Sequence, residues 1–125
     1  MAQFPAGSSI VNVATRAAFR GGSPEHWSYA ASKSAMVSLT NTLARAYSGS
    51  GIYTYGVAPG FVLTDMAQSE FDHDPTLRQR LINEFPYGEI ASAEEIANAI
   101  FFFASGLATH ATGQTLDING ASYVR

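Results

Sequence analysis

The chain has 125 residues, of which 46% are hydrophobic and 14% charged, a size and composition that fit one globular domain and exclude a disordered tail. Its net charge is −3 and no stretch is rich in Arg and Lys, which argues against nucleic acid as the main partner. It contains no cysteine, so disulfide bonds and thiolate metal sites are excluded as well.

The sequence also bears on where the protein works. Its longest apolar run, Ala99–Ala104, is far too short to cross a lipid bilayer. Residues Met1–Pro5 contain neither a basic region nor a long apolar run, so we expect no secretory signal there. We therefore expect a cytoplasmic protein with no membrane partner.

The first predicted strand is the β-branched run Ile10–Ala14, which need not alternate if it is a parallel strand covered on both faces. A loop follows at Gly21–Pro24, and from Trp27 to Tyr47 the residues favour a helix. Apolar residues recur at helical spacing within that helix and predict its buried stripe, Met36, Leu39, Leu43 and Ala46.

A second strand is predicted at Ile52–Val57, before the breaker Pro59-Gly60. The more polar segment Thr64–Glu84 follows, and we expect one or two short helices there. Ser92 and Glu95 then have the spacing of a capping box, which marks the start of another helix.

The rest of the chain is predicted to hold a second core helix and a last strand. Residues at helical spacing should form the buried face of this helix, namely Ile96, Ile100, Phe103 and Leu107. The run Phe101–Phe103 is also expected in the core, and Thr115–Ile118 forms the third predicted strand.

Strands and helices therefore alternate, which predicts an α/β fold with a parallel sheet of about three strands and flanking helices. Three strands make a thin sheet. Because Ile10–Ala14 is too apolar for a comfortable open edge, we expect another segment to belong beside it, and an edge prone to aggregation without that segment.

Tyr29 and Lys33, the only lysine of the chain, are four residues apart within the predicted helix. This spacing places their side chains one turn apart on the same helical face. A cation so close to a phenol favours proton transfer near neutral pH, as carbonyl reduction or alcohol oxidation requires. The alternative is an amphipathic helix with one surface lysine whose stem lies along apolar neighbours.

Several short motifs follow one another along the chain. The run Ile10–Thr15 ends in a hydroxyl residue, and Tyr29–Lys33 comes next. Pro59–Thr64 has a threonine four residues after its glycine, and Thr112–Gln114 precedes the last strand. In this order the motifs resemble those of the short-chain dehydrogenase/reductase family, over nearly the whole chain.

This resemblance implies catalytic roles for Tyr29, Lys33 and Thr15. Tyr29 would donate or accept the proton at the substrate oxygen, and Lys33 would hold the nicotinamide ribose hydroxyls and support Tyr29 electrostatically. Thr15 stands where the family usually has a serine that hydrogen-bonds the substrate oxygen. A threonine keeps the hydroxyl but adds a methyl group and a stiffer side chain, and Thr15 could instead simply cap a strand end.

The resemblance further implies that one loop binds the nicotinamide end of NAD or NADP. Its contacts would come from Pro59, Gly60, Val62 and Thr64, in addition to Tyr29 and Lys33. The backbone of Val62 and the hydroxyl of Thr64 would meet the carboxamide. On the alternative interpretation, Thr64 is only a helix N-cap and Pro59-Gly60 only a turn.

No glycine-rich phosphate-binding loop occurs anywhere in the sequence. In the family that loop, and the residues that distinguish NAD from NADP, precede the strand that corresponds to Ile10–Ala14. Residues 1–125 are therefore expected to form a single partial domain, the C-terminal half of a Rossmann-like, doubly wound sheet. We expect the chain alone to bind a dinucleotide poorly, and the sequence does not choose between NAD and NADP.

The expected function is hydride transfer between NAD(P) and a small-molecule carbonyl or secondary alcohol, with a 3-oxoacyl-thioester reductase as the commonest family activity. The alternative is a catalytically inactive remnant that acts as an interaction module or that another chain completes. The resemblance also implies a homo-oligomer through the Trp27–Tyr47 helix. The three histidines lack metal-ligand spacing, so no metal site is expected at His26, His73 or His110.

Overall fold

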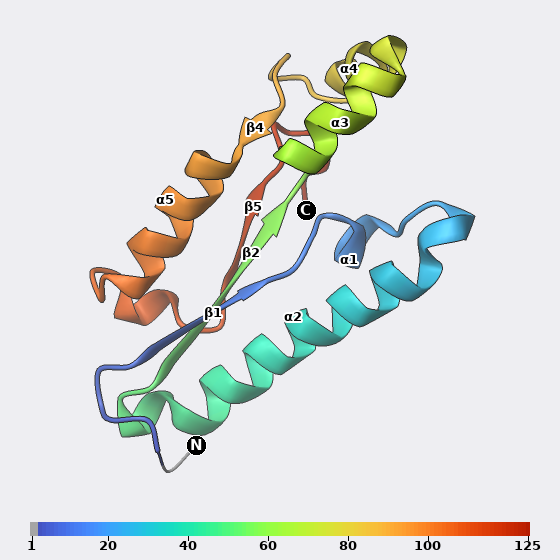
Figure 1. Ribbon diagram of the computed structural model, residues 1–125. Helices are drawn as coiled ribbons and strands as arrows, with labels where there is room; N and C mark the ends of the chain where they lie inside the picture. Colours follow the sequence, from blue (N-terminus) through green and yellow to red (C-terminus); the bar gives the residue numbers. More distant parts are fainter. Residues whose placement is uncertain (1–2) are drawn as a thin grey trace.

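Three short apolar runs pair as a parallel sheet in the computed structural model, which describes residues 3–125 (Figure 1). They are β1 (Ser9–Val13), β2 (Tyr53–Pro59) and β5 (Thr115–Ile118), and their order in the sheet is β1-β2-β5. All three strands were predicted from the sequence, and the α/β class is confirmed. The second strand runs to Pro59, two residues beyond its predicted end at Val57.

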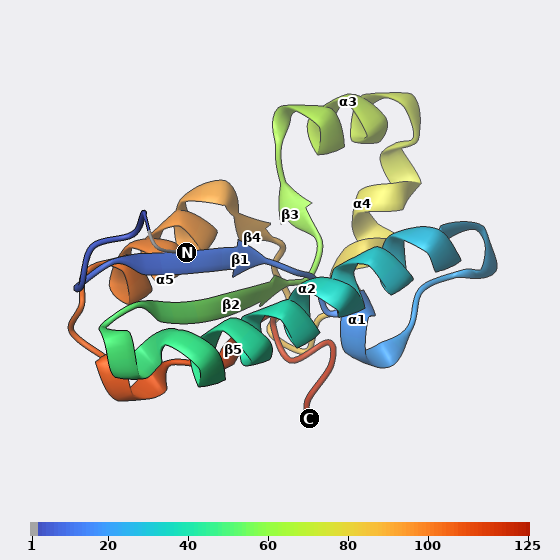
Figure 2. The same cartoon turned by 90° about the horizontal axis from the view of Figure 1, so that it is seen from below.

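The middle strand is buried because it has a neighbour on each side and a helix over each face. α2 (Trp27–Tyr47) covers one face of the sheet and α5 (Ala93–Ala104) covers the other (Figures 1 and 2). The core cluster accordingly joins two residues of β2 to two of α5, namely Tyr55, Val57, Ile96 and Phe103.

Gly56 lies in β2 directly opposite Thr115 of β5. A Cβ at Gly56 would lie 2.5 Å from the hydroxyl oxygen and 3.0 Å from the methyl carbon of Thr115. We expect Gly56→Ala to lower the free energy of unfolding by about 1–3 kcal/mol, because β2 and β5 would have to move apart. Urea denaturation measures this loss.

Gly49 provides the control for that substitution. A Cβ at Gly49 would meet no heavy atom within 4 Å, and its backbone does not require a glycine. Gly49→Ala should therefore change stability little. Equal effects of the two substitutions would show that the contact between Gly56 and Thr115 does not limit the sheet.

The long helix α2 has the predicted bounds, Trp27–Tyr47, but not the predicted buried stripe. Its buried residues are Thr40 and Ala44. These small side chains let the helix lie close to the sheet, where Asn12 of β1 donates a hydrogen bond to the Thr40 hydroxyl at 3.0 Å. The predicted apolar stripe lies on one flank instead, with Leu39 and Ala46 exposed and Met36 and Leu43 half-buried.

α5 begins at the predicted capping box. The Ser92 hydroxyl accepts the amide N–H of Glu95, and the Glu95 carboxylate accepts the N–H of Ser92 at 2.8 Å. Ile96 and Phe103 are buried as predicted and Ile100 is half-buried. Leu107 is exposed, because the helix ends at Ala104 and the chain turns away before it.

The segment between β2 and α5 extends beyond the carboxyl ends of the strands (Figure 2). It contains the two short helices allowed by the sequence, α3 (Asp65–His73) and α4 (Pro75–Ile82). Two very short strands, β3 (Val62–Leu63) and β4 (Ala91–Ser92), pair in parallel at its base and were not predicted. The remaining helical turns are α1 (Ala17–Arg20), Pro24–His26, Ser48–Ser50 and Thr109–Ala111.

Candidate active site

Thr15 comes two residues after the end of β1, where the backbone of the first strand is still tied to that of β2. The Arg16 N–H donates to the Pro59 carbonyl at 2.9 Å, and the Thr15 hydroxyl donates to the same oxygen at 3.4 Å. The second contact is long for an O–H···O hydrogen bond, so it is a weak one. The Thr15 side chain is therefore placed by the strand ends while its proton remains available to another acceptor.

Tyr29 and Lys33 lie one turn apart at the start of α2, as their spacing predicts. The Lys33 ammonium lies 5.8 Å from the centroid of the Tyr29 ring. It donates a 2.8 Å hydrogen bond to the carbonyl of Val13, the last residue of β1. Tyr29 itself is 48% exposed. Lys33 thus links the helix to the end of β1 and stays close to the tyrosine, on the same side of the helix.

The loop after β2 takes a defined path. Pro59 is buried, and a Cβ at Gly60 would lie 3.0 Å from the Phe85 ring and 3.1 Å from Asn119, so the loop passes close to both. Val62 pairs with Ala91 between β3 and β4. The Thr64 hydroxyl accepts the N–H of Ala67 at 3.2 Å, which makes Thr64 the N-cap of α3, as one interpretation of the sequence expects.

An open cleft of about 430 Å³ lies at the carboxyl ends of β1 and β2. It brings together three of the predicted site residues, Thr15, Tyr29 and Gly60. The other predicted residues do not line it, namely Lys33, Pro59, Val62 and Thr64. The volume is within the usual range for small-molecule sites. A hollow of similar volume, about 410 Å³, near Asn41 and Gln114 contains none of these residues.

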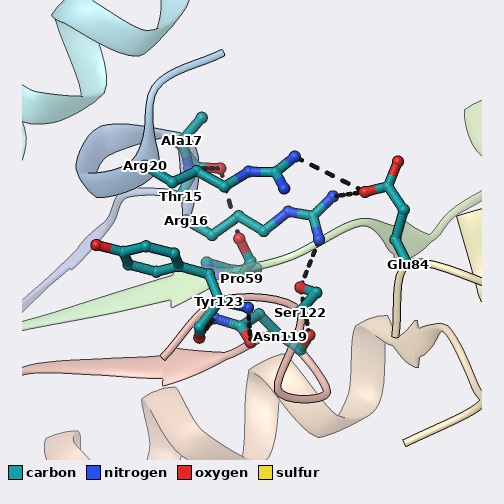
Figure 3. Close-up of polar contacts among 9 residues, drawn as sticks. All are labelled: Thr15, Arg16, Ala17, Arg20, Pro59, Glu84, Asn119, Ser122 and Tyr123. Atoms are coloured by element: carbon teal, nitrogen blue, oxygen red, sulfur yellow. Dashed lines mark hydrogen bonds and ion pairs between the residues drawn. The ribbon is translucent and has the colours of Figure 1, made fainter. Parts of the chain in front are cut away.

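Charged residues that the sequence analysis missed also line the cleft, and Figure 3 shows them. Arg16 is only 7% exposed and donates to the Glu84 carboxylate at 2.8 Å and to the Ser122 hydroxyl. Arg20 reaches the same Glu84 oxygen at 3.7 Å. Arg16 also lies 5.2 Å from the centroid of the Phe85 ring. These contacts tie the end of β1 to the segment after α4 and to the C-terminal loop.

Burial and the nearby Arg20 charge lower the pKa of Arg16, and its bond to Glu84 opposes that shift. The local signal in the sequence was only an arginine next to a threonine. Its partners Glu84 and Ser122 are 68 and 106 residues away along the chain, so no local pattern could have indicated them.

Of the three histidines, only His26 lies at the cleft. His26 lines the cleft and shares a 2.8 Å hydrogen bond with the Ser23 hydroxyl, whereas His73 and His110 are exposed. Within residues 3–125 there is no group of three side chains able to hold a metal ion. No helix in the same residues is both long and apolar enough to span a membrane.

The sequence is similar to reductases that are named for acyl-carrier-protein substrates. A family model described as enoyl-(acyl carrier protein) reductase matches residues 1–121. The 3-oxoacyl-(acyl-carrier-protein) reductase FabG of Escherichia coli (strain K12) is 40% identical over 96 residues, which are 77% of this chain and 38% of that protein. FabG of Staphylococcus aureus (strain Mu50) is 34% identical over 103 residues, 82% of this chain and 41% of that protein.

Solved structures resemble the fold over nearly all of the chain. A short-chain dehydrogenase/reductase described as glucose/ribitol dehydrogenase, from Brucella melitensis, superposes with a TM-score of 0.87 at 33% identity. The match covers 98% of this chain and 48% of that one. A 3-oxoacyl (acyl-carrier-protein) reductase from Agrobacterium tumefaciens C58 with NADP bound gives 0.80 at 27% identity, over 88% and 43%. The chain thus spans less than half the length of these relatives.

Proposed function

The chain belongs to the short-chain dehydrogenase/reductase family, and we propose that it carries the acid–base residues of an NAD(P)-dependent oxidoreductase that acts on a carbonyl or a secondary alcohol. The observation that carries this proposal is the meeting of Thr15, Tyr29 and Gly60 at one cleft, with Lys33 one helical turn from Tyr29. Thr15 and Tyr29 come from different segments of the chain, yet both residues line the same cleft.

The residues present fit the nicotinamide end of such a cofactor. The Lys33 ammonium has three donors and uses one on the Val13 carbonyl, so two remain for ribose hydroxyls. Gly60 lines the cleft beside Thr15 and Tyr29, and it has no side chain to fill that space. When bound, the nicotinamide supplies or accepts the hydride.

The chain's own residues would handle the proton. In reduction, negative charge develops on the carbonyl oxygen of the substrate, and the Tyr29 hydroxyl donates its proton to that oxygen. The Thr15 hydroxyl, whose bond to Pro59 is weak, donates a hydrogen bond to the same oxygen and stabilises the charge. In oxidation, Tyr29 removes the proton from the alcohol.

Two substrate classes fit a site for a carbonyl or a secondary alcohol. A 3-oxoacyl thioester is one candidate because the FabG relatives are named for it, and a polyol is another because the Brucella melitensis neighbour is described as a glucose/ribitol dehydrogenase. A cytoplasmic location accords with a reductase that draws on the cellular nicotinamide pool. Loss of turnover in Tyr29→Phe, argued in the Discussion, tests the acid–base assignment.

We propose in addition that α2 pairs with α2 of a second copy. The sheet does not cover the apolar flank of this helix, where Leu39 and Ala46 are exposed. The same exposed flank also supports the alternative that the chain is an interaction module. If this is right, the chain should sediment as a dimer or larger at micromolar concentration. Leu39→Arg should return it to monomer because it places a charge in the pairing surface.

Asn41 provides the matched control, because it is exposed and lies about 200° around the helix from Leu39. Asn41→Arg should leave the sedimentation coefficient of the assembly unchanged. A wild-type chain that stays monomeric, or an assembly that survives Leu39→Arg, would count against pairing through this flank.

A further inference from the structure

The cleft contains an unbalanced set of charges beside the proposed catalytic hydroxyls. Two guanidinium groups, those of Arg16 and Arg20, share a single carboxylate, that of Glu84. All three residues line the same cleft as Thr15 and Tyr29. Two positive charges against one negative charge leave the cleft wall with a net positive charge, next to the place where a carbonyl would react.

The two arginines are not equivalent. Arg16 is engaged, because its two terminal nitrogens donate to Glu84 and to Ser122 and its plane lies over Phe85. It is buried and acts as a fixed support for the Glu84 carboxylate. Its role is explained by the fold.

Arg20, in contrast, makes no close contact with the described residues that would give it a structural role. Its side chain is 39% exposed, and its contact with Glu84 is 3.7 Å long, outside the range of a normal N–H···O hydrogen bond. A surface ion pair of this kind contributes little to stability. Within residues 3–125 this is the one ion pair of Arg20, so most of its five donors face the cleft or solvent.

We propose that the substrate bears an oxyanion, a carboxylate or a phosphate, in addition to its carbonyl or alcohol group, and that Arg20 binds this anion at the mouth of the cleft. This inference rests on the proposed function for the identity of the reacting group. A guanidinium can bind the two oxygens of such an anion at once, while the carbonyl lies against Tyr29 and Thr15. Burial first, and then the charge of the neighbouring Arg20, lower the pKa of Arg16.

An anion-binding Arg20 would favour substrates with a negatively charged group over neutral substrates with the same carbonyl. A neutral 3-oxoacyl thioester offers Arg20 no anionic group, whereas a keto acid or a keto phosphate does. Binding, rather than turnover, is the appropriate measurement because all the residues that the inference invokes belong to the chain.

The experiment is an NMR titration of the 125-residue chain with two matched pairs of probes. One pair is 4-oxopentanoate and its neutral methyl ester, and the other is dihydroxyacetone phosphate and dihydroxyacetone. At least one charged probe should bind roughly ten- to a hundredfold more tightly than its neutral partner, and which pair responds distinguishes carboxylate from phosphate. Arg20→Gln should remove that advantage.

Two further variants make the test specific. Arg45→Gln removes an exposed arginine that lies about 24 Å along α2 from Tyr29, and it should leave binding unchanged. Glu84→Gln should tighten binding severalfold, because it removes the competing negative charge while its amide oxygen still accepts from Arg16. The amide spectrum of each variant shows whether its fold is native.

Equal binding of charged and neutral probes, binding that survives Arg20→Gln, or no binding of any probe would overturn the inference. The NMR titration measures binding alone and does not depend on hydride transfer. Suppose the chain binds the charged probe through Arg20 but shows no reductase activity even when an upstream segment with the phosphate-binding loop completes it. That result would support this inference and contradict the proposed function.

Discussion

Replacement of Tyr29 by Phe is expected to lower kcat for carbonyl reduction roughly a hundred- to ten-thousandfold, the usual contribution of a positioned general acid. Tyr29 has the one phenol that lines the cleft with Thr15, and Lys33 lies one turn away, 5.8 Å from its ring. The substitution removes only the hydroxyl. It should therefore leave the binding of a carbonyl substrate nearly unchanged while the proton transfer fails.

The assay needs a protein that can bind the dinucleotide phosphates. The 125 residues contain no glycine-rich loop, so turnover is best measured with an upstream segment that carries such a loop joined to this chain or supplied with it. Turnover should appear only with that segment, and it is followed by the absorbance of NADPH or NADH at saturating cofactor.

Tyr47→Phe is the matched control, because it removes a phenolic hydroxyl from the other end of the same helix. It should retain full activity. Turnover in the completed protein that is indifferent to Tyr29→Phe would refute the assignment of Tyr29 as the acid. A completed protein that folds but has no turnover in its wild-type form would favour the inactive remnant instead.

The relation of Tyr29 to Lys33 was predictable because it is local. Two residues four apart on a helix share a face whatever the helix packs against. The bounds of α2 and the capping box at Ser92 followed from local preferences in the same way. The parallel pairing of β1, β2 and β5 followed from the alternation of strands and helices, since each crossover returns the chain to the end of the sheet where the previous strand began.

Contacts that depend on distant segments were not predictable. The stripe of α2 was assigned from hydrophobic periodicity, yet the sheet surface selects the small residues Thr40 and Ala44. Close approach of a helix to a sheet favours small side chains, and periodicity alone does not record that preference. The Arg16 network was missed for a similar reason, because its partners come from two other segments that only the fold brings to the end of β1.

The phenylalanine run of α5 gives the second large expected effect. All three residues of Phe101–Phe103 were assigned to the core, but only Phe103 is buried, at 5% exposure. Its ring stacks on that of Tyr55 with 4.7 Å between centroids and 13° between planes. Phe101 is 73% exposed, because successive residues on a helix point about 100° apart and only one of the three can face the sheet.

Phe103→Ala should therefore lower the free energy of unfolding by about 3–5 kcal/mol, since it removes a stacked ring and leaves a cavity beside Tyr55. Phe101→Ala, two residues earlier on the same helix, should change it by less than about 0.5 kcal/mol. Urea denaturation of the two variants at the same low protein concentration measures the difference. A typical domain has only about 5–15 kcal/mol of stability, so the first substitution removes a large share of it. Similar losses in both variants would mean that the outer face of α5 is covered in solution and that Phe101 is packed as firmly as Phe103.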